Sequence, residues 1–241
     1  TSQGQYAQIK IEQHLNLIWP NLKNQIVISL GYSQPWAKKL AERSEQFIAF
    51  WPLSYFNQND DNDDKALEQL ILQEKQSYIN CVCEHDLLAL EDMSVDKILL
   101  VHMLEHYAID NHLLDELWRV LNGSGSMILI VPARRGLWAR NEHTPFGHGL
   151  TFSKLQLQAR ASRHQFSVQS LERTLYSPPQ LIKKYPNLSS RCDVAMQYLV
   201  PHLAGALISE WSKDIYATTP ACIESKRNFK FKKILKAPNP A

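Results

Sequence analysis

Short apolar runs and amphipathic segments alternate along the first 176 residues of the chain. The run at 25–30 is almost continuous in β-branched and aliphatic residues, which is typical of a parallel strand covered on both faces. Similar runs predict further strands at 47–51, 79–83, 96–101 and 127–131. Between these strands, apolar positions at helical spacing predict helices at 4–19, 36–43, 66–76, 113–121 and 154–162. This alternation predicts an α/β domain with a mostly parallel sheet.

Prolines, small polar residues and a glycine predict where several elements begin and end. Pro20 ends the first helix, which we expect at the edge of the sheet, and Asp110 and Ser153 are expected N-caps. Gly123 is expected as a left-handed C-cap. The last predicted strands are at 166–169 and 173–176, residues 178–202 are helical or irregular, and the pattern at 204–215 fits a helix or a strand equally well.

Charge is distributed unevenly. The chain has 241 residues and a formal net charge of +2, but six of its 26 basic residues lie beyond position 225, where there is no acidic residue. The neutral-to-acidic body argues against a nucleic-acid surface across the whole domain, whereas the basic tail at 220–241 is a candidate contact for an anionic partner. Terminal charge runs are usually only solvated, so the alternative is that this tail has no specific role.

Other composition features narrow the class of protein. No apolar run has the length of a transmembrane segment, and the four cysteines are too scattered for a disulfide framework, so we expect a cytoplasmic protein with reduced thiols. The acidic run at 57–64 has carboxylates for calcium but lacks the glycine and the bidentate glutamate at the required offsets. A solvated loop is the preferred interpretation of this run.

Two motifs lie in the middle of the chain. Val101 to His106 reads Val-His-Met-Leu-Glu-His, and Leu117 to Ser126 reads Leu-Trp-Arg-Val-Leu-Asn-Gly-Ser-Gly-Ser. Together they resemble the class I S-adenosylmethionine-dependent methyltransferases, which often carry His-x-Leu-Glu-His and then a glycine turn after Arg-Val-Leu. The resemblance implies a Rossmann-like sheet of seven strands, mostly parallel and flanked by helices, with the last strand antiparallel. It predicts one domain at 1–219, with a helix at 4–19, a core at 20–176 and an extension at 177–219.

The resemblance is weakest at the expected cofactor site. The family's Gly-x-Gly-x-Gly turn corresponds here to Gly31, Ser33 and Pro35, and the acid that binds the ribose hydroxyls corresponds to Trp51. Either S-adenosylmethionine is bound by other contacts, with Trp51 stacking near the adenosine and Ser33 donating its hydroxyl, or the pocket has lost the cofactor. The cofactor-binding residues expected from the alignment are Gly31, Tyr32, Ser33, Trp51, Glu84, His85 and His102.

The expected adenine contact follows the third strand. On the alignment, Glu84 accepts the adenine amino group beside the backbone N–H of His85; without it, Glu84 would be a solvent-facing charge. His102 is expected to form a wall of the site, and His106 is a weak candidate base. These two histidines also have a metal-ligand spacing, but no third ligand is suggested and no metal is predicted.

The loop at 134–149 combines cations, aromatic residues and histidines after the fifth strand. Its Arg-Arg-Gly-Leu-Trp and Thr-Pro-Phe-Gly-His-Gly segments resemble a subgroup of bacterial methyltransferase-domain proteins that also tend to lack the full glycine turn. We expect it to be a substrate lid, and the alternative is a rigid structural loop. The candidate residues are Arg134, Arg135, Trp138 and Phe146 for substrate binding, and His148, His143 and His106 for catalysis.

The function that the resemblance implies is methyl transfer from S-adenosylmethionine to an acceptor that these residues do not identify. The alternative is a non-catalytic methyltransferase-like protein that serves as a binding or assembly partner. A dehydrogenase-type nucleotide binder is disfavoured, because the first turn lacks its glycines and the second strand lacks the ribose acid.

Overall fold

The computed structural model describes residues 1–52, 78–84, 87–107, 112–140, 144–147 and 149–215. The predicted helix at 66–76, the acidic run, the predicted cap Asp110 and the basic tail lie outside these residues.

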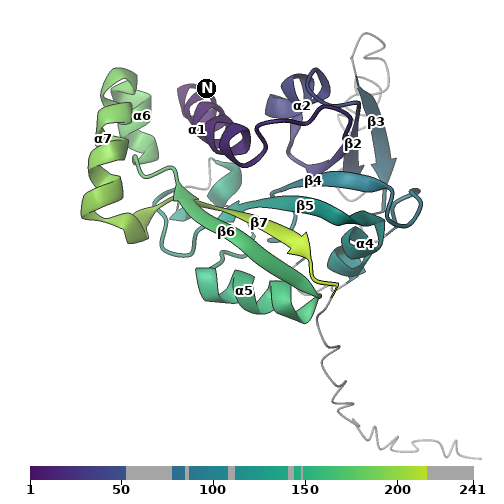
Figure 1. Cartoon of the computed structure of the whole chain (residues 1–241). Coiled ribbons are helices and arrows are strands. Elements are labelled where there is room, and N and C mark those ends of the chain that lie inside the picture. Colours follow the sequence, from purple (N-terminus) through teal and green to yellow (C-terminus); the bar gives the residue numbers. More distant parts are fainter. Residues whose placement is uncertain (53–77, 85–86, 108–111, 141–143, 148, 216–241) are drawn as a thin grey trace, which may run out of the picture.

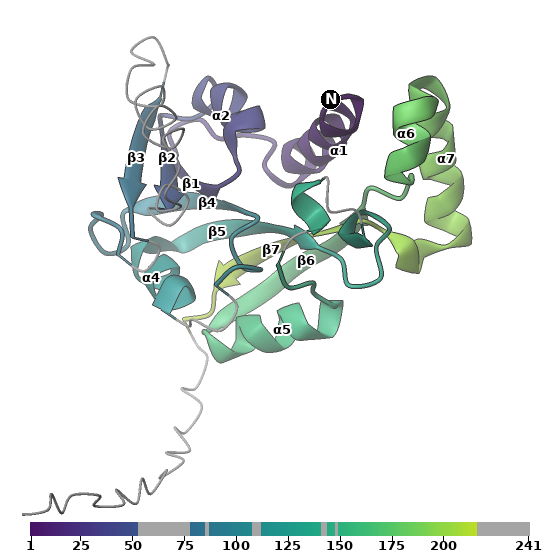
Figure 2. The same ribbon diagram turned by 180° about the vertical axis from the view of Figure 1, so that it is seen from behind.

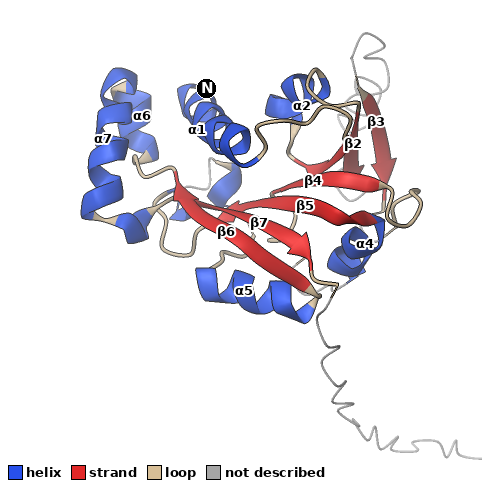
Figure 3. Cartoon of the chain, in the orientation of Figure 1, coloured by secondary structure: helices blue, strands red, loops and turns tan. Residues whose placement is uncertain are grey.

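A seven-stranded sheet forms the centre of the molecule, in the order β3-β2-β1-β4-β5-β7-β6 (Figure 3). Its five parallel strands are β1 (Ile26–Gly31), β2 (Gln46–Pro52), β3 (Ile79–Cys83), β4 (Val95–Val101) and β5 (Leu121–Pro132). Strand β7 (Ala206–Lys213) runs antiparallel to both of its neighbours, β5 and β6 (Phe166–Thr174). The expected Rossmann-like architecture with an antiparallel last strand is therefore confirmed.

The end of the sheet differs from the prediction in its details. The predicted strands at 166–169 and 173–176 are one continuous strand, β6, with a register irregularity between Val168 and Ser170. The ambiguous segment at 204–215 contains β7, so the seventh strand comes from the expected C-terminal extension. Ser209 and Lys213 interrupt its apolar pattern, yet both are buried. The Ser209 hydroxyl donates to the Ser170 carbonyl at 3.0 Å, and the Lys213 ammonium donates to the Leu121 carbonyl at 2.8 Å.

Helices cover both faces of the sheet (Figures 1 and 2). One face carries α1 (Ser2–Ile18), α2 (Gln34–Ala41), α6 (Pro179–Lys184) and α7 (Pro186–Leu199), and the other carries α4 (His112–Val120) and α5 (Lys154–Arg163). Short 3₁₀ turns occur at Trp138–Arg140, Pro145–Gly147 and Pro201–Leu203. Ser153 caps α5 as predicted, and Gln156 completes a reciprocal capping box.

Helix α1 covers a face of the sheet, so its expected position at the edge was wrong. Its buried residues Ile11 and Leu15 belong to the same apolar cluster as Ile128 and Ile130 of β5. A helix with an apolar stripe buries more surface on the face of a sheet than at an edge, which explains the difference. This position brings the N-terminal end of α1 to the site described below.

The predicted C-cap at Gly123 was also wrong. Helix α4 ends at Val120 and β5 starts at Leu121, while Gly123 does not adopt the left-handed conformation. The Arg119 carbonyl, near the end of the helix, instead accepts a hydrogen bond of 2.9 Å from the Met93 amide. Part of the capping is therefore done by the loop before β4.

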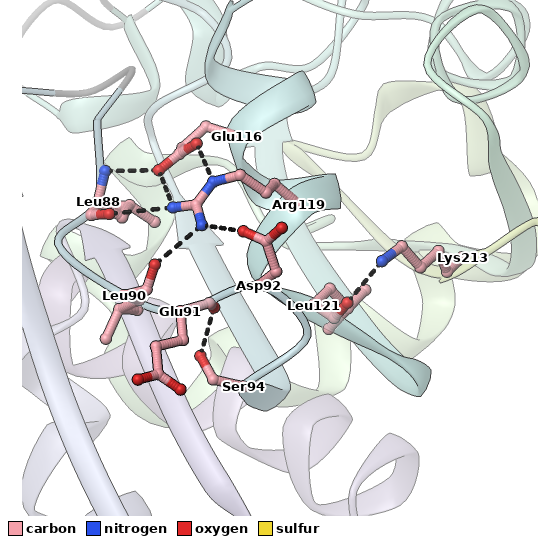
Figure 4. A network of polar contacts seen from close by, with 9 residues as sticks. All are labelled: Leu88, Leu90, Glu91, Asp92, Ser94, Glu116, Arg119, Leu121 and Lys213. Carbon is pink, nitrogen blue, oxygen red and sulfur yellow. Dashed lines mark hydrogen bonds and ion pairs between the residues drawn. The ribbon is translucent and has the colours of Figure 1, made fainter.

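The same loop is held by the guanidinium group of Arg119 (Figure 4). This group donates to both carboxylate oxygens of Glu116, to the carboxylate of Asp92 and to the carbonyls of Leu88 and Leu90. Glu116 also accepts the Leu88 amide at 2.7 Å. The arginine of the Arg-Val-Leu motif thus fixes a loop to a helix.

Candidate active site at the ends of strands β1 and β4

Strands β1 and β4 are neighbours in the sheet. From β1 the chain continues to β2 and β3 on one side, and from β4 it continues to β5, β6 and β7 on the other side. Ligands of open α/β sheets bind beyond the carboxyl ends of the strands at such a switch point. Here the two ends are joined by a hydrogen bond of 3.1 Å from the Tyr32 amide to the Val101 carbonyl. The residues that follow them, Tyr32 and His102, are both predicted site residues and lie at one cavity.

Gly31 makes the turn after β1 possible. Its φ of 84° lies in the left-handed region, where a side chain is strained. A Cβ atom there would lie 2.1 Å from the Val101 carbonyl oxygen and 2.7 Å from Cγ of Met103. The glycine is therefore required by the close approach of β4 and the loop that follows it.

Ser33 faces the protein interior. Its hydroxyl lies 2.7 Å from the hydroxyl of Ser29, and both side chains are buried. The turn therefore contains a neutral hydrogen bond between two buried serines. The Ser33 hydroxyl therefore already has a partner in Ser29, and its donation to the cofactor stays a prediction.

A cavity of about 300 Å³ opens beside this turn. The turn contributes Tyr32, Pro35 and Trp36, and α1 contributes Gln3, Gln5 and Gln8. The remaining polar groups include the hydroxyl of Thr144, while aromatic rings provide much of the apolar wall. Among the described residues that line it there is no carboxylate, so the cavity is polar without being acidic.

His102 lines this cavity, and its ring is held in place. Its Nδ1 is 2.6 Å from Oε1 of Glu105, and the two side chains are almost fully buried. Since a carboxylate only accepts hydrogen bonds, Nδ1 carries the proton when Glu105 is ionised. His102 also has a φ of 55°, a conformation that costs a non-glycine residue about 1–2 kcal/mol. The Glu105 contact and the bond from the His102 amide to the Ile130 carbonyl hold this conformation.

A chain of aromatic contacts extends from His102 to α1. The ring of Phe146 meets His102 edge to face at 4.4 Å between centroids, and Trp138 meets Phe146 edge to face at 5.5 Å. Trp138 also stacks on Tyr6, and its indole N–H donates to the Ser177 carbonyl at 2.9 Å. Two predicted lid residues are therefore buried parts of the cavity wall.

The nucleoside end of the expected site has a different character. Trp51 is only 8% exposed, and its indole N–H donates to Oδ1 of Asn80 on β3 at 3.3 Å. The single polar group of this side chain is therefore directed at the neighbouring strand. Glu84, which follows β3, is exposed. The segments that continue beyond these two strands, 53–77 and 85–86, lie outside the described residues.

The predicted substrate-binding set is divided between two places. Trp138 and Phe146 line the cavity beside His102, whereas Arg134 and Arg135 line a second cavity on the side of α5. His106 is exposed and does not line the first cavity. His85, His143 and His148 lie outside the described residues.

Several residues of the site were not expected from the sequence. Glu105 was not among the expected site residues, but it is the partner of His102. The three glutamines of α1 reach the cavity because this helix crosses the face of the sheet. Trp36 also lines the cavity, and its indole N–H donates to the Gln8 carbonyl at 3.1 Å. Among these residues, only Glu105 could have been found from the sequence, because it lies three positions after His102 and residues three apart can meet within one turn.

The fit to S-adenosylmethionine differs between the two ends of that molecule. Aromatic rings attract cations, so the wall near His102 suits a sulfonium. On α1, the side-chain amides of Gln3 and Gln8 already donate to the carbonyls of Pro179 and Pro35 at 2.8 Å, so part of their hydrogen-bonding capacity is used within the protein. At the ribose end, Trp51 supplies no acceptor. A volume of about 300 Å³ is at the lower end for ligand sites, so a nucleoside would have to extend from this cavity toward β2 and β3.

The described residues contain no cluster of three potential ligands arranged around a metal position. None of their helices combines the length and apolar content that a membrane span needs.

Comparison with known proteins gives matches of two kinds. A family model described as "Methyltransferase domain" matches residues 54–129, which is under a third of the chain. No curated protein matches. Among solved structures, a S-adenosylmethionine-dependent methyltransferase from Archaeoglobus fulgidus is similar with a TM-score of 0.58 at 14% identity, over 84% of this chain and 93% of that one.

Two further solved structures agree. A methyltransferase from Thermotoga maritima, titled a possible histamine N-methyltransferase, has a TM-score of 0.56 at 13% identity, over 88% of this chain and 91% of that one. A complex of a Haloferax volcanii methyltransferase activator with a putative methyltransferase gives 0.57 at 15% identity, over 84% and 88%. At these identities the likeness concerns the fold. The chain therefore has the Rossmann-like fold of S-adenosylmethionine-dependent methyltransferases, and its segment 54–129 matches the model of a methyltransferase domain.

Proposed function

We propose that this protein transfers a methyl group from S-adenosylmethionine to an acceptor that enters the cavity beside His102. The observation that carries the proposal is the meeting of Tyr32, His102, Trp138 and Phe146 at one cavity, at the switch point where this fold binds ligands. The methyltransferase-domain match and the shared fold support the same reaction. The cytoplasmic location expected from the cysteines and the bacterial character of the loop motif remain predictions.

Bound S-adenosylmethionine would supply an electrophilic methyl group on a sulfonium. The protein's part in such a displacement is to align the acceptor and to exclude water. Phe146 and Trp138 are buried and form the apolar wall needed for this. Because they are buried, these two residues form a fixed boundary of the site. They can exclude water without movement of the lid predicted for 134–149.

In this proposal His102 is the base when the acceptor carries a proton, in place of His106. Glu105 would orient the imidazole by accepting the proton of Nδ1, so that Nε2 is the basic nitrogen. The same pairing stabilises the imidazolium that forms when Nε2 takes a proton. His106 is exposed and has no comparable orientation, while His143 and His148 remain candidates from the sequence alone.

Titration calorimetry of the full chain with S-adenosylmethionine and S-adenosylhomocysteine tests the proposal. We expect both to bind with dissociation constants in the micromolar range, with weaker affinity than a site that keeps a ribose carboxylate. If neither binds at millimolar concentration, the proposal fails and the non-catalytic alternative takes its place.

Variants of the two histidines locate the site. His102→Asn should weaken S-adenosylhomocysteine binding at least fivefold, because the ring forms part of the cavity wall beside Phe146. His106→Asn is the matched control and should change the affinity less than twofold. Equal effects of the two substitutions would place the ligand outside this cavity. Thermal unfolding of both variants distinguishes lost binding from lost folding.

A further inference from the structure

A second cavity, of about 560 Å³, lies on the side of α5 and is lined by cationic side chains. Arg134 and Arg135 follow β5, Arg173 is near the end of β6, and Lys154 is the first residue of α5. His202 adds a group that is cationic when protonated. We call the cavity lined by these residues the cationic pocket. No carboxylate occurs among the described residues that line it.

The arginines of the cationic pocket are not neutralised within the protein. In the part of the chain that the structure describes, Arg134, Arg135 and Arg173 make no hydrogen bond and no ion pair through their side chains. Glu172, next to Arg173 on β6, pairs instead with His14 of α1 at 2.8 Å. Three guanidinium groups around one hollow therefore have open donor positions.

The pKa of Lys154 reflects the positive charge gathered in this pocket. Its ammonium group donates to the Leu171 carbonyl at 3.1 Å, which fixes it at the wall of the pocket. Burial lowers the pKa of Lys154, and repulsion from Arg173 lowers it further, against a smaller opposing effect of Glu172. The pocket thus holds like charges close together, an arrangement that an anion would relieve.

The start of α5 adds backbone donors to the same wall. The capping box uses the amides of Ser153 and Gln156, whereas helix geometry leaves the amides of Lys154 and Leu155 without a partner inside the helix. Both of these residues line the pocket. Such amides, together with arginines that bind bidentately, are the groups that hold phosphate in proteins.

The shape of the pocket limits the size of the ligand. Phe152 and Leu207 contribute apolar surface to its wall, and Leu155, which is 78% exposed, provides another apolar surface. A cavity of this volume accommodates a small molecule. The cations gather around a hollow, whereas binding of a nucleic acid would call for a stripe along a backbone path.

We propose that the cationic pocket binds the phosphate group of a small phosphorylated ligand. The proposal does not depend on methyl transfer, since the pocket shares no lining residue with the cavity at His102. The two cavities border the same loop after β5, with Arg134 and Arg135 on one side and Trp138 on the other.

Calorimetric titration of the full chain with pyrophosphate and with inorganic phosphate at low salt tests this inference. Pyrophosphate should bind with a submillimolar dissociation constant and more tightly than inorganic phosphate. Arg173→Gln and Arg134→Gln should each weaken its binding at least fivefold. Arg163→Gln is the matched control, because this exposed arginine lies in the last turn of the same helix α5 and should change the affinity less than twofold.

Three results would overturn the proposal. The first is no pyrophosphate binding at millimolar concentration. The second is equal losses in Arg173→Gln and Arg163→Gln, which would indicate diffuse charge. The third is a single-stranded oligonucleotide without terminal phosphate that binds more tightly than pyrophosphate and with the same dependence on Arg173. S-adenosylhomocysteine affinity, measured in parallel, should be unchanged in Arg173→Gln, so failure of this proposal and failure of the proposed function are distinguishable.

Discussion

The loop before β4 and the turn after β1 both connect to the parallel sheet, but they satisfy their polar groups differently. In the loop, Arg119 binds two carboxylates and two carbonyls at once. In the turn, the hydroxyls of Ser29 and Ser33 form a neutral pair 2.7 Å apart. The loop is therefore held by charged groups, whereas the buried polar groups of the turn are paired without charge.

Within the turn after β1, Gly31 is the residue that the backbone requires, and replacing it should have the largest effect on stability. Gly31→Ala combines a left-handed φ with a Cβ 2.1 Å from a backbone oxygen. We expect the free energy of unfolding to fall by about 3 kcal/mol or more. Urea denaturation followed by circular dichroism measures the change.

Gly123→Ala is the control for this substitution. A Cβ at Gly123 would meet only side-chain atoms, at 3.6 and 3.8 Å, and φ there is not positive. Its stability should stay within about 0.5–1 kcal/mol of the unsubstituted chain, in the stabilising direction. Similar losses in both variants would mean that the turn after β1 has no special requirement for glycine.

The sequence predicted the elements that depend on local pattern. The five parallel strands and the cap of α5 at Ser153 follow from continuous apolar runs and from a capping box, which act over a few residues. Strand β7 was not distinguished from a helix, because its buried polar residues Ser209 and Lys213 are paired with carbonyls of β6 and β5, which no local pattern reveals. Gly123 was misread because the capping partner of α4 comes from Met93, a residue outside the helix.

The candidate site was predictable to a smaller extent. His102 and Tyr32 could be placed because they follow strands, and strand ends meet at one edge of the sheet. The separation of Arg134 and Arg135 from Trp138 could not be predicted, because it depends on how the loop after β5 divides between two faces of the molecule. The glutamines of α1 carry no pattern of their own, and their role arises from the packing of that helix.

Breaking the Arg119 network should have the second largest effect. Arg119→Met removes the hydrogen bonds to Glu116 and Asp92 and leaves the buried Glu116 without its cation. We expect a loss of about 2–3 kcal/mol in the free energy of unfolding, because hydrogen bonds to charged groups are the strong ones. Arg43→Met removes another half-buried arginine, which makes fewer bonds, and it should cost less.

The same network predicts a dependence on pH. Hydrogen bonding from Arg119 lowers the pKa of Glu116 below its ordinary value. The resulting stability is present above the ordinary carboxylate pKa of about 4 and is lost as the pH falls through the lowered value. Denaturation between pH 7 and pH 2 should therefore show a smaller acid-induced loss in Glu116→Gln than in the unsubstituted chain. An unchanged pH profile would contradict this assignment.

Trp51→Phe should have the smallest effect on stability of these substitutions, and it tests the role of Trp51 at the nucleoside end of the site. The substitution keeps a buried aromatic ring and removes the indole N–H that donates to Asn80, so we expect a loss of about 1 kcal/mol in stability. S-adenosylhomocysteine affinity should change less than twofold, because that N–H already has a partner in the sheet. Trp36→Phe, which removes the bond from α2 to Gln8 beside the cavity, should weaken the affinity more. A tenfold loss in Trp51→Phe at unchanged stability would instead support the earlier hypothesis that this indole stacks on the adenosine.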